Sequence, residues 1–129
     1  MQFLADTVTI VRHFSDSGHL GLQAREAMEG ADRKQNIIFI SIVSMAEILY
    51  LSEKNRIRTN LTKAIEIISR TSNYQITDLN LEVITEAQVV RGLELHDRLI
   101  VSTARVLGIP LLTSDKMITE SGLVEVIWK

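Results

Sequence analysis

The stretch Ile37-Ile38-Phe39-Ile40-Ser41 decides the fold class of this chain. Four consecutive apolar residues in so short a segment are typical of a strand that is buried on both faces. Strands of this kind occur in parallel sheets that carry helices on either side. Four other short apolar segments predict further strands, at Gln2 to Ala5, Gln75 to Thr77, Pro110 to Leu112 and Val124 to Trp128.

Amphipathic helices are predicted between these strands. Apolar residues recur three and four positions apart, for example at Leu61, Ala64, Ile65 and Ile68, as a helix with one buried face requires. Alternation of strands and helices indicates parallel βαβ units. We therefore expect one α/β domain over residues 1–129, with three layers: a central twisted parallel sheet between two layers of helices.

Composition and charge exclude several classes of protein. The chain has 129 residues, of which 46% are apolar and 23% are charged, which is ordinary for a globular domain. The absence of cysteine excludes disulfides and thiolate metal sites. No signal segment and no apolar run of membrane-spanning length is visible, so we expect a cytoplasmic protein without membrane contact. A net charge of −2 means that any nucleic-acid contact must be local.

Four acidic residues are predicted to meet at one edge of the sheet. Asp6 and Asp115 follow the first and fourth strands, Glu47 lies in the first turn after the second strand, and Asp97 opens the helix that leads to the fourth. Ligands of open α/β sheets bind at the carboxyl ends of the strands. A helix that returns to the next parallel strand begins at the same edge. Carboxylates from four distant segments should therefore converge there.

Each acid taken alone has a structural explanation. Ser44-Met45-Ala46-Glu47 matches a capping box, and Asp97 and Asp115 stand where acids stabilise helix N-termini. Convergence favours a ligand, because clustered carboxylates repel one another unless something positive lies among them. An all-oxygen acidic site suits Mg²⁺ or Mn²⁺. Such ions activate water for phosphodiester hydrolysis, so the residues predict a metal-dependent, phosphoryl-cleaving site.

Several blocks of sequence resemble the PIN-domain nucleases, and among them the VapC-type toxins of toxin–antitoxin pairs. They are residues 3–7 (FLADT), 40–48 (ISIVSMAEI), 95–104 (LHDRLIVSTA), 108–118 (GIPLLTSDKMI) and 121–128 (SGLVEVIW). The resemblance covers nearly the whole chain and implies a PIN-like fold. The family's acidic quartet, which binds Mg²⁺ or Mn²⁺ for RNA cleavage, falls on the same four acids.

The resemblance also implies roles for individual residues. Asp6, Glu47 and Asp97 would be the core metal ligands, Asp115 would complete the site, and Thr113 or Ser114 would position a water or a carboxylate. This chain departs from the family pattern after Asp6, where residues 7–10 read Thr-Val-Thr-Ile instead of beginning with Thr-His, and at Phe14, where Trp is frequent. These departures bear on substrate choice and on the antitoxin groove.

Basic residues near this edge are candidates for substrate binding. Arg12, Arg98 and Lys116 adjoin the acids in sequence, and the densest basic run contains Lys54 and Arg56. This run could simply be the solvated end of a helix, where cations are favoured. Alternatively, it could bind RNA phosphates or the acidic tail of a partner. His96 adjoins Asp97, but neighbouring residues of a helix point in different directions. Because a two-metal reaction also needs no histidine, we do not expect His96 to be catalytic.

Three other functions compete with the nuclease. A phosphoacceptor receiver domain has similar length and sheet order, but it needs an acidic pair after the first strand. A phosphatase that forms an aspartyl phosphate needs a second aspartate where Val8 stands. A non-catalytic RNA- or protein-binding module would use the acids only as helix caps. The sequence thus favours a Mg²⁺/Mn²⁺-dependent endoribonuclease that acts on RNA as a toxin, pairs with a cognate antitoxin and forms a homodimer.

Overall fold

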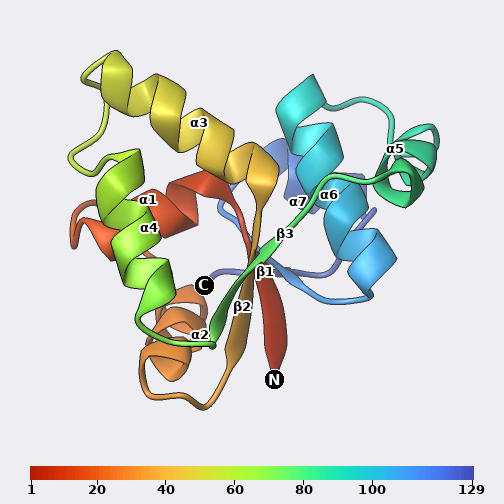
Figure 1. The fold of residues 1–129 in the computed structure, drawn as a ribbon. Coiled ribbons are helices and arrows are strands. Elements are labelled where there is room, and N and C mark those ends of the chain that lie inside the picture. The colour runs from red at the N-terminus through yellow and green to blue at the C-terminus, as the bar shows by residue number, and fades with distance from the viewer.

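The computed structural model describes all residues from Met1 to Lys129, arranged as a five-stranded sheet between two layers of helices (Figure 1). The strands are β1 (Gln2–Ala5), β2 (Ile37–Ser41), β3 (Tyr74–Thr77), β4 (Leu111–Leu112) and β5 (Val126–Ile127). The helices are α1 (Thr7–Phe14), α2 (Leu22–Asp32), α3 (Ile42–Glu53), α4 (Leu61–Ser69), α5 (Leu81–Ala87), α6 (Leu95–Leu107) and α7 (Lys116–Ser121). The predicted three-layer α/β/α fold is confirmed.

The sheet is parallel throughout and has the strand order β3-β2-β1-β4-β5. This order differs from the 2-1-3-4-5 order of receiver domains, which removes that alternative. Strand β1 lies in the centre, where Ala5 pairs with Ile40 of β2 and with Leu112 of β4. The carboxyl ends of these three strands are therefore level.

Alternating side chains of the strands build two separate cores. Phe3 and Ala5 of β1 pack with α1 to α4 on one face, whereas Leu4 packs with α5 to α7 on the other. Figure 1 shows the same division, with α1 to α4 on one side of the sheet and α5 to α7 on the other. The apolar run of β2 serves both cores, because Ile38 and Ile40 face the first and Phe39 the second. Both faces of the central strands are thereby removed from water.

Specific residues begin and end several of the helices. Gly108 and Gly122 end α6 and α7 in the left-handed conformation, with φ of +68° and +67°, which glycine adopts without steric cost. The predicted capping box at Ser44 is wrong, because Ser41 caps α3 and accepts a hydrogen bond from the Val43 amide. Glu47 consequently lies in the second turn of α3 and not in the first. No helix is both long and apolar enough to cross a membrane.

Burial of Leu4 in the central strand β1 should make this residue important for stability. Leu4 is fully buried in the second core, so Leu4→Ala should lower the free energy of unfolding by about 2–5 kcal/mol. Leu22→Ala is the matched control, because Leu22 is 62% exposed and its truncation should change that free energy by less than about 0.5 kcal/mol. Urea denaturation measures both. Equal losses in the two variants would contradict the assignment of Leu4 to the core.

Candidate active site

Asp6 leaves the end of β1 and caps helix α1. Its Oδ1 accepts hydrogen bonds from the Thr9 amide at 2.9 Å and the Thr9 hydroxyl at 2.6 Å. Thr9 is fully buried, so this carboxylate is held rigidly. Removal from water raises the pKa of Asp6 above 3.8, although hydrogen bonds from Thr113 and Thr9 act in the opposite direction. The nearby charge of Asp115 raises it further.

Glu47 reaches the same edge from the second turn of α3. Its Oε1 accepts a hydrogen bond from the Thr7 hydroxyl at 2.7 Å, and that hydroxyl lies 2.9 Å from the Ser44 hydroxyl. Thr7 and Ser44 are both buried, so a polar network inside the fold orients this carboxylate. The other oxygen, Oε2, lies 3.6 Å from Nδ1 of His96.

Asp115 follows β4 and caps α7. Its Oδ1 accepts a hydrogen bond from the Ile118 amide at 3.0 Å, and its own amide donates to the Thr113 hydroxyl at 3.1 Å. Thr113 is fully buried and also contacts Asp6. One threonine therefore contacts both of the acids that follow β1 and β4.

The pKa of Asp97 responds to the charges of the other three acids. Asp97 lies in the first turn of α6, which Glu94 caps through a hydrogen bond from the His96 amide. Removal from water, followed by the negative charges of Asp115, Glu94, Glu47 and Asp6, raises the pKa of Asp97 to about 6. The other three predicted acids thus lie near enough to Asp97 to act on its carboxylate. No Lys or Arg forms an ion pair with any of them.

Comparison with known proteins identifies the fold family. The family model of the PIN domain matches residues 3–121. The chain belongs to the PIN domain family. No curated protein sequence matches it.

Solved structures show the same fold at low sequence identity. The chain aligns with VapBC2 from Rickettsia felis bound to a promoter DNA fragment, covering 100% of both chains at a TM-score of 0.73 and 18% identity. A toxin–antitoxin complex from Klebsiella pneumoniae has a TM-score of 0.66 and 20% identity, covering 96% of this chain and 94% of that one. VapC20 from Mycobacterium tuberculosis, a sarcin-ricin loop cleaving toxin, has a TM-score of 0.69 and 15% identity, covering 96% and 98%.

The acidic residues of this PIN domain suit a hydrated hard cation. Carboxylate and hydroxyl oxygens are the donors at the edge, and Mg²⁺ commonly binds through one or two carboxylates and several waters. No three acidic or histidine side chains lie close enough to enclose a metal ion together. The chemistry of the donors therefore fits the ion, whereas a closed cage of three protein ligands is not formed.

The predicted basic residues do not form one group. Arg98 turns away from the acids and donates from Nε to the Ala87 carbonyl at 2.8 Å, so it ties α6 to the end of α5. Lys54 lies over the ring of Tyr50, at 5.7 Å from its centroid. Lys116 lines a cavity beside Thr113 and Ser114. Arg12 and Arg56, which are distant in sequence, line a common cavity.

Two groups of residues at this edge were not predicted from the sequence. The hydroxyls of Thr7 and Thr9 hold Glu47 and Asp6, and the only signal was their position directly after Asp6. Glu94 adds a fifth negative charge near Asp97. The sequence feature that could have identified Glu94 is its position shortly before Asp97, where the helix was predicted to begin. The predicted residue Ser114 is exposed, whereas its neighbour Thr113 is buried among the acids.

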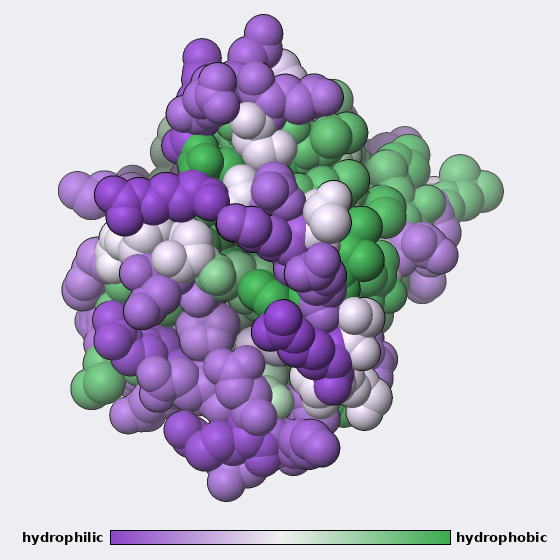
Figure 2. Space-filling view, turned by 60° about the vertical axis from the view of Figure 1, so that its left-hand side comes forward, coloured by the Kyte–Doolittle hydropathy of each residue, from purple (hydrophilic) through white to green (hydrophobic).

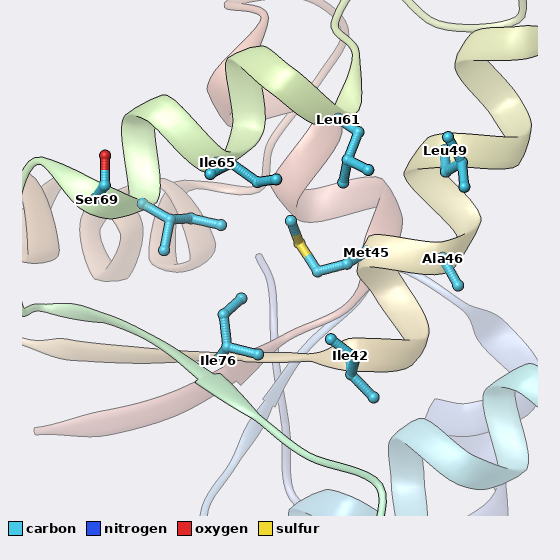
Figure 3. Close-up of a pocket in the computed structure, with 9 residues that line it drawn as sticks. Ile42, Met45, Ala46, Leu49, Leu61, Ile65, Ser69 and Ile76 are labelled. Carbon is cyan, nitrogen blue, oxygen red and sulfur yellow. The ribbon is translucent and has the colours of Figure 1, made fainter.

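An apolar groove lies apart from the acids in this PIN domain. It has a volume of about 520 Å³ between α3, α4 and β3, and eight of its nine lining residues are hydrophobic. Figure 3 shows Met45 of α3, Leu61 and Ile65 of α4 and Ile76 of β3 around this space. Ile65 is 51% exposed. In Figure 2, hydrophobic side chains gather towards the right-hand side of the face, and the lower part is largely hydrophilic.

The raised pKa of Asp97 predicts a pH-dependent stability. A folded-state pKa of about 6, above the ordinary 3.8, makes the free energy of unfolding fall as pH rises between these values. In EDTA, Asp97→Asn should therefore unfold at a higher temperature than the wild type at pH 7.5. This gain should shrink as the pH is lowered to 4, as measured by thermal denaturation across that range.

The control for this prediction is Glu26→Gln, which removes the same charge from an exposed position on α2. It should show no comparable pH-dependent gain. If Asp97→Asn is less stable than the wild type at pH 7.5, the carboxylates do not repel one another as described.

Proposed function

We propose that this PIN domain is a Mg²⁺- or Mn²⁺-dependent endoribonuclease. The observation that carries the proposal is the convergence of four carboxylates, from four segments of the chain, at the carboxyl edge of the sheet without a lysine or arginine partner. Burial, and after it the negative charges of the neighbouring acids, raise the pKa of Asp97 to about 6, and a bound divalent cation would offset both effects. Helix capping explains Asp6 and Asp115 singly, but it does not explain the electrostatic strain at Asp97.

Asp6, Glu47, Asp97 and Asp115 would hold the ion, directly or through water. When bound, the ion supplies charge stabilisation at a phosphoryl oxygen and a more acidic water. The threonines of this chain do the positioning: Thr9 holds one oxygen of Asp6, Thr7 holds one oxygen of Glu47, and Thr113 couples Asp6 to Asp115. Preoriented ligands need no rearrangement when the substrate arrives.

A toxin role and an antitoxin partner are part of the same proposal. They are supported by the likeness to a toxin–antitoxin complex and to a toxin that cleaves the sarcin-ricin loop. Exposed apolar surface supports association with protein partners, since Ile65 on α4 is 51% exposed and Leu81 and Ile84 on α5 are 79% and 44% exposed. We propose a cognate antitoxin and a homodimer as the partners, and the cytoplasm as the site of action.

A non-catalytic binding module of PIN fold is the alternative. It is favoured by the absence of three acids close enough to enclose a metal ion, and by the caps that Asp6 and Asp115 provide. The two functions are distinguished by RNA cleavage, which only the nuclease would catalyse.

RNA cleavage by the purified protein tests the proposal. Wild-type protein with Mg²⁺ or Mn²⁺ should cut total RNA into discrete fragments, and EDTA should stop the reaction. Asp6→Asn and Asp97→Asn should each lower the rate by roughly 100-fold or more, because loss of supporting residues around a metal site alone costs 10–100-fold. The fragments are resolved by gel electrophoresis, and their ends identify the cleavage site.

Glu26→Gln serves again as the matched control, because it removes one carboxylate from an exposed helix face without touching the sheet edge. It should cleave at the wild-type rate. Circular dichroism should show that all three variants are folded. Cleavage that persists in EDTA or in the Asp6→Asn variant would refute the metal site, and a folded, metal-loaded protein without any cleavage would favour the binding module.

A further inference from the structure

A cavity lined by arginines lies beside the acidic edge. It has a volume of about 520 Å³ and is formed by α1, the loop after α1, the end of α3 and the segment that follows α3. Three of its ten lining residues are Arg12, Arg56 and Arg58, and no acidic residue lines it. None of these arginines forms an ion pair. Three positive charges therefore line one cavity, and no carboxylate lies within ion-pair distance of them.

Arg12 is held in place within this cavity. Its Nη1 donates a hydrogen bond to the His19 carbonyl at 2.7 Å. Its stem packs closely on Gly18, where φ is +72° and an added Cβ would lie 3.0 Å from three atoms of the arginine side chain. A guanidinium fixed in this way loses little conformational freedom when it binds a ligand.

The other two arginines are placed by the end of α3. Asn55 has a φ of +55°, and the amides of Asn55 and Arg56 donate to the carbonyls of Ser52 and Leu51, which closes the helix. Ile57, between the two arginines, packs against the first core and anchors the segment. Arg56 and Arg58 remain exposed at the cavity.

The cavity and the acidic edge share a residue. Thr7 lines the cavity and its hydroxyl is 2.7 Å from Oε1 of Glu47. A chain molecule that leaves the carboxylates on the Thr7 side therefore passes the arginines. The apolar residues Val8, Val11, Leu51 and Ile57 also line the cavity and offer a surface for a sugar or a base.

We propose that this cavity binds a phosphate group of the RNA strand next to the phosphate that is cleaved; the proposal rests on the proposed ribonuclease function. Guanidinium groups match the paired oxygens of a phosphodiester and can donate two parallel hydrogen bonds to it. The acidic edge repels RNA, and the net charge of the chain is −2, so binding requires local positive charge. Continuity with the acidic edge favours the RNA strand over an acidic peptide as the ligand.

Binding of a labelled RNA in the absence of metal tests this proposal. The probe is a fluorescein-labelled, single-stranded 20-nucleotide RNA, measured by anisotropy in EDTA, with every protein carrying Asp6→Asn so that the probe stays intact. Arg12→Ala and Arg58→Ala should each weaken binding by roughly tenfold, as expected for the loss of a charged hydrogen bond. Each should also reduce the slope of log K against log salt by about 0.7.

Arg33→Ala is the matched control, because it removes the same charge from the C-terminal end of α2, next to the amino ends of the strands. It should bind the probe as the parent protein does. Arginine variants that bind RNA no more weakly than Arg33→Ala would overturn the proposal. It would equally be overturned if the arginine variants lost binding only to a labelled decaglutamate peptide.

The test also separates this inference from the proposed function. If wild-type protein cleaves RNA with Mg²⁺ and the arginine variants cleave it with unchanged KM, the inference fails and the nuclease stands. If no protein binds or cleaves RNA, both fail.

Discussion

Four acidic side chains are brought together, partly buried, at the carboxyl edge of the parallel sheet, where burial and like charge both disfavour their ionised forms. Asp6, Glu47, Asp97 and Asp115 come from four segments, and the level ends of β1, β2 and β4 bring them together. The protein tolerates this cost by hydrogen-bonding the acids to buried hydroxyls and helix amides. Helix capping alone does not explain why four carboxylates gather at one edge of the sheet.

Thr7 lies at the boundary between the acidic edge and the cavity lined by arginines. The carboxylates lie on one side of Thr7 and the arginines of the α1–α3 cavity on the other. If arginines reached the carboxylates directly, they would neutralise them and compete with a cation. For the ribonuclease proposed above, this separation would let the arginines attract the RNA backbone while the carboxylates hold the metal ion.

Much of the fold could be predicted from the sequence, because parallel strands buried on both faces leave a strong pattern. The bounds of β2 were predicted correctly from its apolar run, and the four acids were placed at one edge by topology alone. The hydroxyls of Thr7 and Thr9 could not be recognised, since a threonine near an aspartate has no distinctive pattern until tertiary contacts choose its partner. Lys54 and Arg56 looked alike in sequence, yet the turn at Asn55 sends one towards Tyr50 and the other to the cavity.

Diffraction from crystals grown with Mn²⁺, recorded on both sides of the manganese absorption edge, would show whether the acidic edge binds a divalent cation. We expect an anomalous peak at the sheet edge, bounded by the carboxylates of Asp6 and Asp97 and absent from crystals of Asp6→Asn. A Mn²⁺-saturated crystal without a peak at that edge, or with its only peak elsewhere on the molecule, would contradict the proposed metal site.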